Sequence, residues 1–496
     1  MIFRFELIQH PHEFQISNFC PRPVLVGLVL CVLLPTFFSY ISRRKKTSIQ
    51  HQLPPMSPKG LFQLIKELAS TEAPLHALET LKQMNTMTYR SKLGLTVGLH
   101  TIVVGDAKTT RKILNDPITK KPRQVYGRLD DVTSGYMSLI TSDGGAEWHR
   151  RRKGMSTAFS SKHIRRMNKV AMQKINTWID TRLSKFIEND EAFDVGEEMN
   201  RIILAALTET AFQYEMSNEE GEEYKKELEH SLKEFASKSL ANPLRKPFGI
   251  FLSDRRRAHQ GSKYITNLSL KIMESYRKLQ NPIKETLIDC IMTNPTYKSD
   301  MERAADITAT MIAGHDTTAY TLAWVLRELA RAPKEQEKLR LSLEAMGEDA
   351  WDKSPVLRNV VREAMRLYPV LGKGVTRIIG RDFVTSEGYL LPKGSLLFLP
   401  FITALRNPDV FEKADSFIPS RWENATKEMN ESFYPFAMGK QNCIGQSLVN
   451  AEIHTIVPRI CCEFELEVVD EGRPESFLTW KPLKTMLKVK RVTKHE

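Results

Sequence analysis

The segment around Cys443 contains the residues best suited to chemistry. Cys443 stands between Gly439 and Gly445, just before a stretch that we expect to be helical. Glycines let a backbone bend tightly and approach a large flat ligand. Backbone N–H groups and a helix start lower the pKa of a thiol and stabilise a thiolate. A cysteine beside glycines is more often a buried structural thiol, so this segment alone leaves both interpretations open.

Asp316 and Thr317 are a second candidate pair, within the apolar helical stretch Ile307–Leu329. The run Ala-Gly-His-Asp-Thr-Thr that contains them starts at Ala313. Gly, Asp and Thr are poor residues for a helix interior. A functional distortion that opens the helix at Gly314 would explain them, with Asp316 and Thr317 relaying protons through water. The alternative is a capped helix break, because Asp-Thr-Thr also suits an N-cap.

Two further patterns carry little information by themselves. Trp148 begins the run Trp-His-Arg-Arg-Arg, which ends at Arg152 and otherwise indicates a basic, solvated helix face. Glu363 and Arg366 share a helix face three residues apart, a spacing that is common in surface pairs of small energetic effect.

These residues must be positioned mostly by helices. Apolar residues recur at helical spacing in three stretches, and a further helix is expected after the cysteine: Ile164–Phe186, Arg201–Phe212, Ile307–Leu329, and Cys443 to about Cys462. Short strands are expected in four places: Gly94–Val104, Gly374–Ile379, Tyr389–Phe398 as a hairpin turning at Pro-Lys-Gly, and Phe464–Lys490. The sequence therefore predicts a mainly α fold with small β-sheets, in a single large globular domain.

The N-terminal region predicts a membrane anchor. Val24–Ile41 is apolar and uncharged, close to the length of roughly 20 residues that crosses a bilayer as a helix. A basic stop follows at Arg43–Lys46. A cleaved signal peptide is the alternative, but Glu6 and Glu13 precede the apolar run and no cleavage site follows it. We predict an N-terminal extension at 1–23, a transmembrane anchor at 24–41, a basic stop and Pro-rich hinge at 42–60, and the catalytic domain at 61–496.

Composition limits the partners that the chain can have. Its 496 residues are 41% hydrophobic, which supplies a sizeable core, and the net charge is +13. Lys and Arg are scattered rather than gathered in one stripe, which argues against nucleic acid and favours acidic lipid or an acidic protein. The six cysteines include no CxxC pair or Cys/His cluster, so we expect buried thiols in a reducing compartment. His149 and His315 each stand alone and are expected to be bystanders.

The segment from Phe436 to Gly445 resembles the Phe-x-x-Gly-x-x-x-Cys-x-Gly signature of the cytochrome P-450 superfamily of heme-thiolate monooxygenases. The other patterns appear in family order, and the resemblance covers roughly Pro54 to the C-terminus. It implies the cytochrome P-450 fold and heme b (iron protoporphyrin IX), with Cys443 as the metal ligand. Gln441 departs from the family, which usually has Arg or His there to pair with a heme propionate.

The resemblance also implies roles for the other candidates. Asp316 and Thr317 correspond to an acid–alcohol pair that delivers protons to reduced dioxygen, with Gly314 beside the dioxygen. The remaining cofactor-binding residues belong to the cysteine loop or reach the propionates: Phe436, Gly439, Gly445, Trp148, Arg152 and Arg377. A buried structural network, which is not catalytic, is implied for Glu363, Arg366 and Arg421.

A protein of this kind inserts one oxygen atom from O2 into a lipophilic organic substrate. The sequence has no G-x-G-x-x-G fingerprint and no flavin-domain extension, so its electrons must come from a separate protein. The resemblance implies that this partner is a microsomal reductase, with NADPH acting only through it. The basic surface near Trp148–Lys153 is the expected docking face. The microsomal branch of the family implies the endoplasmic reticulum membrane with a cytoplasmic catalytic domain; another organelle membrane is the alternative.

Two other functions remain as alternatives: a heme-thiolate isomerase or dehydratase of lipid hydroperoxides, and a non-catalytic heme sensor or carrier. Asp316 and Thr317 argue against both, because neither function needs an acid–alcohol pair. Tyr126–Ile140 and Asn242–Leu252 are expected to line or cap the substrate route. The second segment is apolar enough to dip into a membrane, although an ordinary loop with core anchors explains it equally well.

Overall fold

The computed structural model describes residues 52–60, 63–64, 66–67, 70, 72–92, 100–239, 242, 245–476 and 478–492. The expected extension at 1–23, the anchor at 24–41 and the basic stop that follows it lie outside these residues. In the part of the chain that is described, no helix is both long and apolar enough to span a bilayer.

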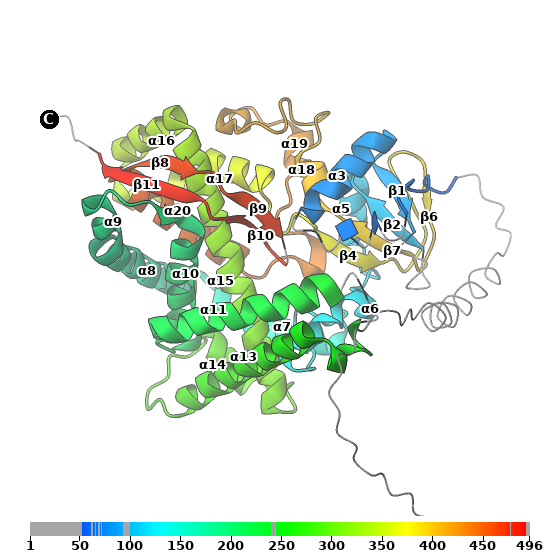
Figure 1. The fold of residues 1–496 in the computed structure, drawn as a ribbon, viewed down its shortest axis with the longest axis horizontal. Coiled ribbons are helices and arrows are strands. Elements are labelled where there is room, and N and C mark those ends of the chain that lie inside the picture. The colour runs from blue at the N-terminus through cyan, green and yellow to red at the C-terminus, as the bar shows by residue number, and fades with distance from the viewer. Residues whose placement is uncertain are drawn as a thin grey trace, which may run out of the picture. The chain divides into compact units, whose positions relative to one another are not determined.

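Helices make up most of the described structure (Figure 1). They are α3 (Ala73–Met84), α5 (Ala107–Asn115), α6 (Arg123–Tyr126), α7 (Ala146–Met155), α8 (Ser161–Trp178), α9 (Ser184–Glu188), α10 (Val195–Phe212), α11 (Asn218–Leu232), α13 (Ser253–Arg277), α14 (Leu287–Thr293), α15 (Asp300–Arg331), α16 (Pro333–Met346), α17 (Pro355–Leu367), α18 (Phe401–Leu405), α19 (Lys427–Ser432) and α20 (Gln446–Cys461). Two π-helical turns interrupt this pattern, η3 (Ile179–Leu183) and η4 (Lys233–Lys238). The short 3-10 turns are η1 (Leu129–Thr133), η2 (Ser156–Phe159), η6 (Gly249–Phe251), η7 (Glu348–Lys353), η8 (Pro419–Trp422) and η9 (Gly439–Gln441).

The strands form small sheets. They are β1 (Thr88–Ser91), β2 (Thr101–Val104), β3 (Phe193–Asp194), β4 (Val375–Ile378), β5 (Phe383–Val384), β6 (Leu390–Leu391), β7 (Leu396–Leu399), β8 (Phe464–Asp470), β9 (Arg473–Ser476), β10 (Trp480–Leu483) and β11 (Met486–Arg491). The sheet orders are β1-β2-β7-β4, β3-β11-β8, β9-β10 and β5-β6. In Figure 1, the four-stranded sheet lies to one side of the long helices. The mainly α architecture with small sheets is therefore confirmed.

The expected hairpin over Tyr389–Phe398 is wrong, although both of its strands exist. β6 pairs with β5, whereas β7 pairs in parallel with β2 and antiparallel with β4. The turn residue Gly394 has φ +82°, so the local signal for a turn was sound. A turn specifies a change of direction, but the long-range partner of each strand is set by packing in the whole fold.

The predicted Pro-rich hinge is partly absorbed into the folded unit. The Arg90 N–H donates to Pro55 O at 2.8 Å, and the Ser57 N–H donates to Arg90 O at 2.9 Å. The Arg90 guanidinium also donates to Pro54 O. These bonds hold residues 54–57 beside β1, so this part of the chain is not a free linker.

α15 lies at the centre of the helical region, and its sequence explains its start. The Ser299 hydroxyl caps the helix by accepting the Glu302 N–H, and acidic residues in the first turn favour the positive end of the helix dipole. Apolar residues of α15 pack with α8, α10, α17 and α20 in one core cluster, and with α11 and α13 in another.

The expected opening of the helix at Gly314 is wrong, because α15 is α-helical from Asp300 to Arg331. A Cβ on Gly314 would lie 2.9 Å from a methyl carbon of Leu207. Glycine at this position therefore allows α10 and α15 to approach closely. Close packing of α15 against α10 therefore explains why position 314 is a glycine, although the sequence alone suggests a helix break there.

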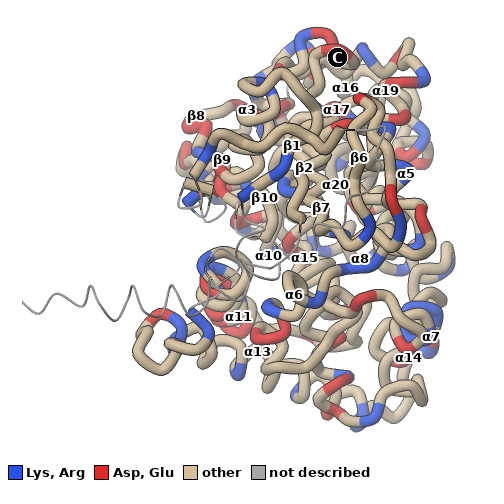
Figure 2. The backbone as a smooth tube through the Cα atoms, turned by 90° about the vertical axis from the view of Figure 1, so that its right-hand side faces the viewer, with Lys and Arg blue, Asp and Glu red and all other residues tan. Residues whose placement is uncertain are grey.

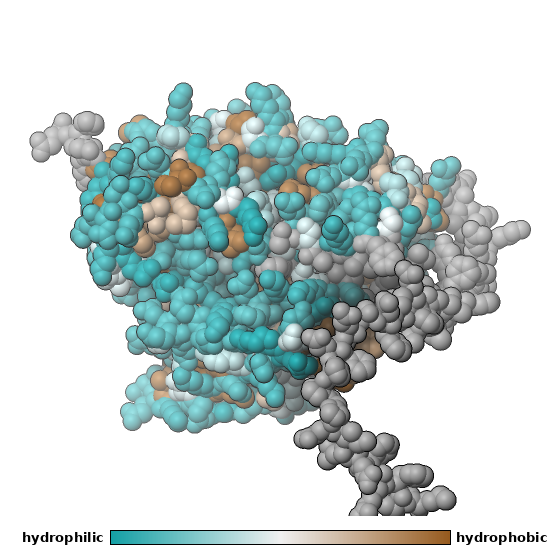
Figure 3. All heavy atoms as spheres, in the orientation of Figure 1, coloured by the Kyte–Doolittle hydropathy of each residue, from teal (hydrophilic) through white to brown (hydrophobic). Residues whose placement is uncertain are grey.

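The surface carries charges of both signs. Figure 2 shows Lys and Arg distributed among Asp and Glu along the chain, without a single basic stripe. The face in Figure 3 is mostly hydrophilic, with hydrophobic residues in small scattered groups.

Glu363, Arg366 and Arg421 form the buried network that the sequence predicted. Arg366 makes two 2.9 Å bonds to the Glu363 carboxylate, and Arg421 donates to the same carboxylate at 2.9 Å. The Trp422 indole and the Ile418 N–H also donate to Glu363. Arg366 also donates to three backbone carbonyls, those of Leu405, Ala414 and Ser416. The network joins α17 to η8 and to the loop between them.

Glu363→Gln is expected to lower the free energy of unfolding by about 3–5 kcal/mol, because buried guanidinium groups would lose their counter-charge. Urea denaturation followed by circular dichroism measures this effect. Glu423→Gln is the matched control, since Glu423 pairs with Lys338 at the surface, where such pairs contribute about 0–1 kcal/mol. Equal effects of the two substitutions would contradict the structural role of the network.

Candidate active site

The cysteine loop is shaped by its own backbone. Gly439 has φ +73°, and a Cβ there would lie 2.2 Å from Leu114 O, so only glycine fits. The Cys443 N–H donates to Phe436 O at 2.9 Å. This bond closes the loop directly before α20. The sequence predicts a helix after the cysteine, and α20 confirms that prediction.

The Cys443 side chain is exposed, although it lies deep enough within the protein for burial to raise the pKa of its thiol. The sulfur is therefore open to solvent, with enough protein around it to disfavour the charged form. The Gly445 and Gln446 N–H groups and the charge of Arg152 act in the opposite direction and lower the pKa of the thiol. These groups are suited to stabilising a thiolate.

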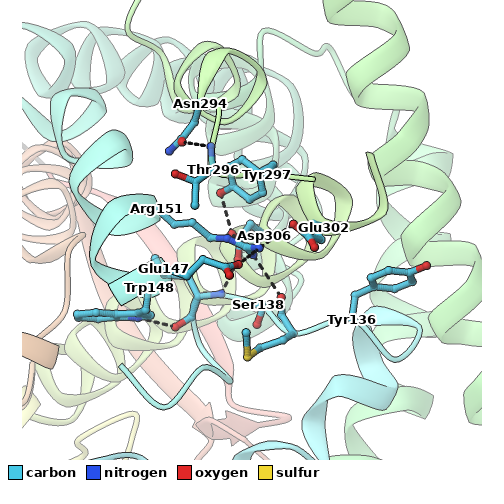
Figure 4. Close-up of polar contacts among 12 residues, drawn as sticks. Tyr136, Ser138, Glu147, Trp148, Arg151, Asn294, Thr296, Tyr297, Glu302 and Asp306 are labelled. Carbon is cyan, nitrogen blue, oxygen red and sulfur yellow. Dashed lines mark hydrogen bonds and ion pairs between the residues drawn. The ribbon is translucent and has the colours of Figure 1, made fainter. Parts of the chain in front are cut away.

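Arg152 connects α7 to the cysteine loop. Its guanidinium donates to Asn442 Oδ1 at 2.8 Å and lies over the Trp148 ring at 5.4 Å. Trp148 is buried, and its indole N–H donates to Leu139 O at 3.0 Å (Figure 4). In this structure the single donor of Trp148 is therefore engaged by the backbone, while Arg152 lies beside the residue that precedes Cys443.

Lys121 joins this group of cations. Burial together with the charges of Arg377 and Arg152 lowers the pKa of Lys121 to about 7. The hydrogen bonds of the three cations go to neutral oxygens: Leu139 O and Ile140 O for Lys121, Asn442 Oδ1 for Arg152, and Thr376 O for Arg377. Within the described residues, no carboxylate forms an ion pair with any of the three.

Asp143 acts on Lys121 only electrostatically and without a direct ion pair, so three shielded cations that lack a paired carboxylate favour binding of an anion. The two carboxylates of heme b meet this need, and the nearby Cys443 sulfur supplies the donor that the iron requires. The residues present therefore fit heme b. We define Lys121, Arg152 and Arg377 as the cationic cluster.

Gln441 does not contribute to the cationic cluster. Its amide nitrogen lies 3.4 Å from Asp143 O and packs on Gly144, where a Cβ would clash with it at 2.3 Å. The sequence raised the question of what replaces the missing cation at this position. Lys121 is the additional cation that the structure provides.

Asp316 and Thr317 point to different neighbours. Asp316 is buried, accepts the Thr479 hydroxyl at 2.6 Å and lies 3.4 Å from the Asn200 amide nitrogen. The Thr317 hydroxyl donates to Ala313 O at 2.6 Å, which satisfies it within the helix. Ala313 is exposed although its neighbour Ile312 is buried, so this side of α15 is open to solvent.

The family of the chain follows from comparison with known proteins. The family model described as Cytochrome P450 matches residues 53–493. The chain belongs to the cytochrome P450 family. Members of this family bind heme b and act as oxygen-dependent monooxygenases, and this chain is an oxidoreductase of that kind.

Relatives agree with this assignment. The chain is 25% identical to "Probable cytochrome P450 508C1" of Dictyostelium discoideum, over 91% of this chain and 95% of the relative. It is 26% identical to "Cytochrome P450 4F12" of Homo sapiens, over 78% and 80% of the two chains. A crystal structure of a cytochrome P450 (CYP102L1) shares the fold with a TM-score of 0.70 and 21% identity, covering 84% of this chain and 98% of that one.

The structure of this cytochrome P450 gathers part of the predicted site. Trp148 and Arg152 lie together beside the cysteine loop, and Arg377 acts electrostatically on the same lysine as Arg152. No hydrogen bond between described residues joins Asp316 or Thr317 to the cysteine loop. The Nδ1 atoms of the two histidines lie against helix carbonyls, Gly145 O for His149 and Met311 O for His315.

Sequence reasoning missed Lys121, Asn442 and Thr479 as parts of the site. Lys121 carries a weak signal only, as one of two adjacent lysines before a proline. Thr479 lies 163 positions from Asp316, so no local spacing could have linked them. Asn442 is next to the cysteine, but its use by Arg152 depends on the position of α7.

Proposed function

We propose that this cytochrome P450 inserts one oxygen atom from O2 into a lipophilic organic substrate, with Cys443 as the thiolate that would hold the heme iron and electrons supplied by a separate NADPH-dependent reductase. The observation that carries the proposal is the exposed Cys443 thiol beside Arg152 and the N–H groups of Gly445 and Gln446. Bound heme supplies the reductive activation of dioxygen, which amino-acid side chains cannot perform.

The protein's own groups divide the remaining tasks. Cys443 donates its sulfur, and Phe436 holds the loop by accepting the Cys443 N–H. The cationic cluster binds the two carboxylates of heme by charge-assisted hydrogen bonds. Trp148 stacks under Arg152 and supports its orientation.

Lys121 makes a pH-dependent contribution that can be measured. The pKa of Lys121 is about 7 when no heme carboxylate is bound. A bound carboxylate would raise this pKa. Above pH 7, the lysine would therefore take up a proton when heme binds. Heme affinity should therefore fall as pH rises above 7, since the lysine must then be recharged on binding.

Transfer of heme to apomyoglobin at pH 7 to 9 measures this expectation. Wild-type protein should lose heme faster as pH rises, and Lys121→Met should lose most of that dependence. Lys120→Met is the matched control, because Lys120 is exposed and should retain the wild-type profile. Parallel pH profiles for wild type and Lys121→Met would exclude Lys121 from heme binding.

Asp316 is suited to holding a proton between solvent and the reacting oxygen. It lines a pocket of about 210 Å³ together with His315, Thr479 and the charged side chains Glu197 and Lys225. A proton from this pocket can reach Asp316, and the Thr317 hydroxyl follows it on the helix. We propose that Asp316 and Thr317 form the acid–alcohol pair, with Gly314 beside them as the point where α15 packs on α10.

Membrane attachment would determine how lipophilic substrates reach the active site. We propose residues 24–41 as a single transmembrane anchor, and the endoplasmic reticulum as its location. Near α13, Ile250 and Phe251 are 70% and 75% exposed, and such side chains can enter a lipid surface. A second contact of this kind would let lipophilic compounds enter from the membrane.

The reductase is proposed to bind where basic side chains approach the cysteine loop. Arg150 and Lys153 are exposed on α7, the helix that reaches Asn442 through Arg152. A pocket of about 420 Å³ lined by Arg358, Arg362 and Phe436 also adjoins this loop. These basic groups suit an acidic protein surface.

Oxygen uptake by the purified full chain tests the function. We expect NADPH, a microsomal reductase and a lipophilic compound to be required together, after spectral titration against fatty acids, sterols and terpenoids has identified a compound that binds. Turnover of lipid hydroperoxides without reductase would favour the isomerase or dehydratase instead. Binding of heme without any substrate-dependent oxygen uptake would favour a sensor.

A further inference from the structure

The loop between η1 and α7 is fixed by side chains rather than by regular secondary structure (Figure 4). Its centre is the Leu139 peptide. The Leu139 N–H donates to the Asp306 carboxylate of α15. The Leu139 carbonyl accepts the Trp148 indole N–H at 3.0 Å and the Lys121 ammonium at 3.3 Å. The backbone of one residue therefore connects α15 to two side chains of the candidate heme site.

Neighbouring peptides of the loop are held in the same manner. Lys121 also donates to Ile140 O at 2.9 Å, and Arg123 donates to Thr141 O at 2.7 Å. Lys121 lies 5.7 Å from the centre of the Trp148 ring. Because these donors come from outside the loop, the place of Lys121 and the conformation of the loop depend on each other.

Asp306 is the buried anchor on the other side of the loop. Its carboxylate is fully buried, accepts the Tyr297 hydroxyl at 2.7 Å and lies 3.4 Å from the Arg151 guanidinium. Arg151 is itself buried and pairs with Glu302 at 2.8 Å and with Glu147. A carboxylate with three donors in a low-dielectric interior is held in one orientation, since any movement would leave a buried polar group unpaired.

We propose that Asp306, supported by Arg151 and Tyr297, is a positioning residue for the heme site: it fixes the Leu139 peptide and so sets the positions of Lys121 and Trp148. This inference rests on the proposed function, because it assigns the cationic cluster to the heme carboxylates. We propose that Asp306 acts only through the loop and not by contact with the heme or the substrate.

Asp306→Ala in the full chain tests the proposal with two measurements. Hydrogen exchange of the peptide covering 136–142 should increase about ten-fold, the effect of losing one hydrogen bond to a charged group. Heme transfer to apomyoglobin should also accelerate about ten-fold, since Lys121 and Trp148 lose their common support. Asp306→Asn should restore much of both values, because its amide oxygen can still accept the Leu139 N–H.

Asp300→Ala is the matched control on the same helix. The Asp300 side chain is 45% exposed and pairs with Arg277 and Arg303, so both rates should stay at the wild-type value. If Asp306→Ala does not fold, Tyr297→Phe removes a single bond to Asp306 and should change both rates in the same direction by a smaller factor. Exchange that increases uniformly along the chain, or heme loss at the wild-type rate, would overturn the positioning role.

The failure of this inference can be told from the failure of the proposed function. Wild-type protein without a thiolate-type spectrum would overturn the function itself, whatever the loop does. A wild-type thiolate spectrum combined with unchanged heme retention in Asp306→Ala and Tyr297→Phe would overturn only the positioning role.

Discussion

Cys443→Ala is expected to reduce substrate-dependent oxygen uptake to the background rate. Alanine has no group that can donate an electron pair to iron, and the N–H groups of Gly445 and Gln446 would face no anion. Loss of the thiolate removes the donor that favours O–O cleavage in this family. The effect should be the largest of any single substitution in the chain that leaves the fold intact.

Cys462→Ala is the control for this prediction. Cys462 follows α20 and is half-buried, and burial raises the pKa of its thiol to about 11, so it is unsuited to forming a thiolate at neutral pH. Its substitution should leave turnover and heme content near wild type. Substantial turnover in Cys443→Ala, measured by oxygen electrode and product analysis, would show that another residue holds the iron.

Asp316→Asn should lower product formation by about 100-fold, the lower end of what a positioned acid or base contributes. An amide cannot release a proton, yet it has nearly the shape of the carboxylate, and its oxygen can still accept the Thr479 hydroxyl. The solvent deuterium isotope effect on turnover should increase, because proton delivery becomes slower than the other steps.

Product and hydrogen peroxide measured together separate proton delivery from general damage. In Thr317→Ala, oxygen consumption should continue while more of it leaves as peroxide, since the hydroxyl that completes the relay is missing. Asp300→Asn on the same helix should behave as wild type. Coupled turnover at the wild-type rate in both Asp316→Asn and Thr317→Ala would remove these residues from the mechanism.

The sequence predicted the helices well because their signals are local. Apolar spacing located parts of α8, α10 and α15, although α10 begins at Val195 rather than Arg201 and α15 at Asp300 rather than Ile307. The strands near residues 390 and 398 were also found, but their pairing was not, because β7 takes its partners from distant segments. Gly314 was misjudged for a related reason: its neighbour Leu207 belongs to another helix.

In the candidate site, too, the sequence predicted the residues of one local motif but not those that the fold brings together from distant segments. Cys443, Gly439 and Gly445 lie within one short motif, so the sequence could identify them together. Lys121 and Asp306 have no such motif, and their relation to Trp148 exists only through the backbone of Leu139. Residues that support a site from several elements become visible only when the elements are assembled.

The absorption spectrum of the reduced, carbon-monoxide-treated full-length protein tests whether Cys443 binds the heme iron. Thiolate ligation by Cys443 predicts the red-shifted Soret band typical of heme-thiolate proteins, present in wild type and in Cys290→Ala and absent in Cys443→Ala. A wild-type spectrum without that band, or the same band in Cys443→Ala, would contradict the assignment of Cys443 as the iron ligand.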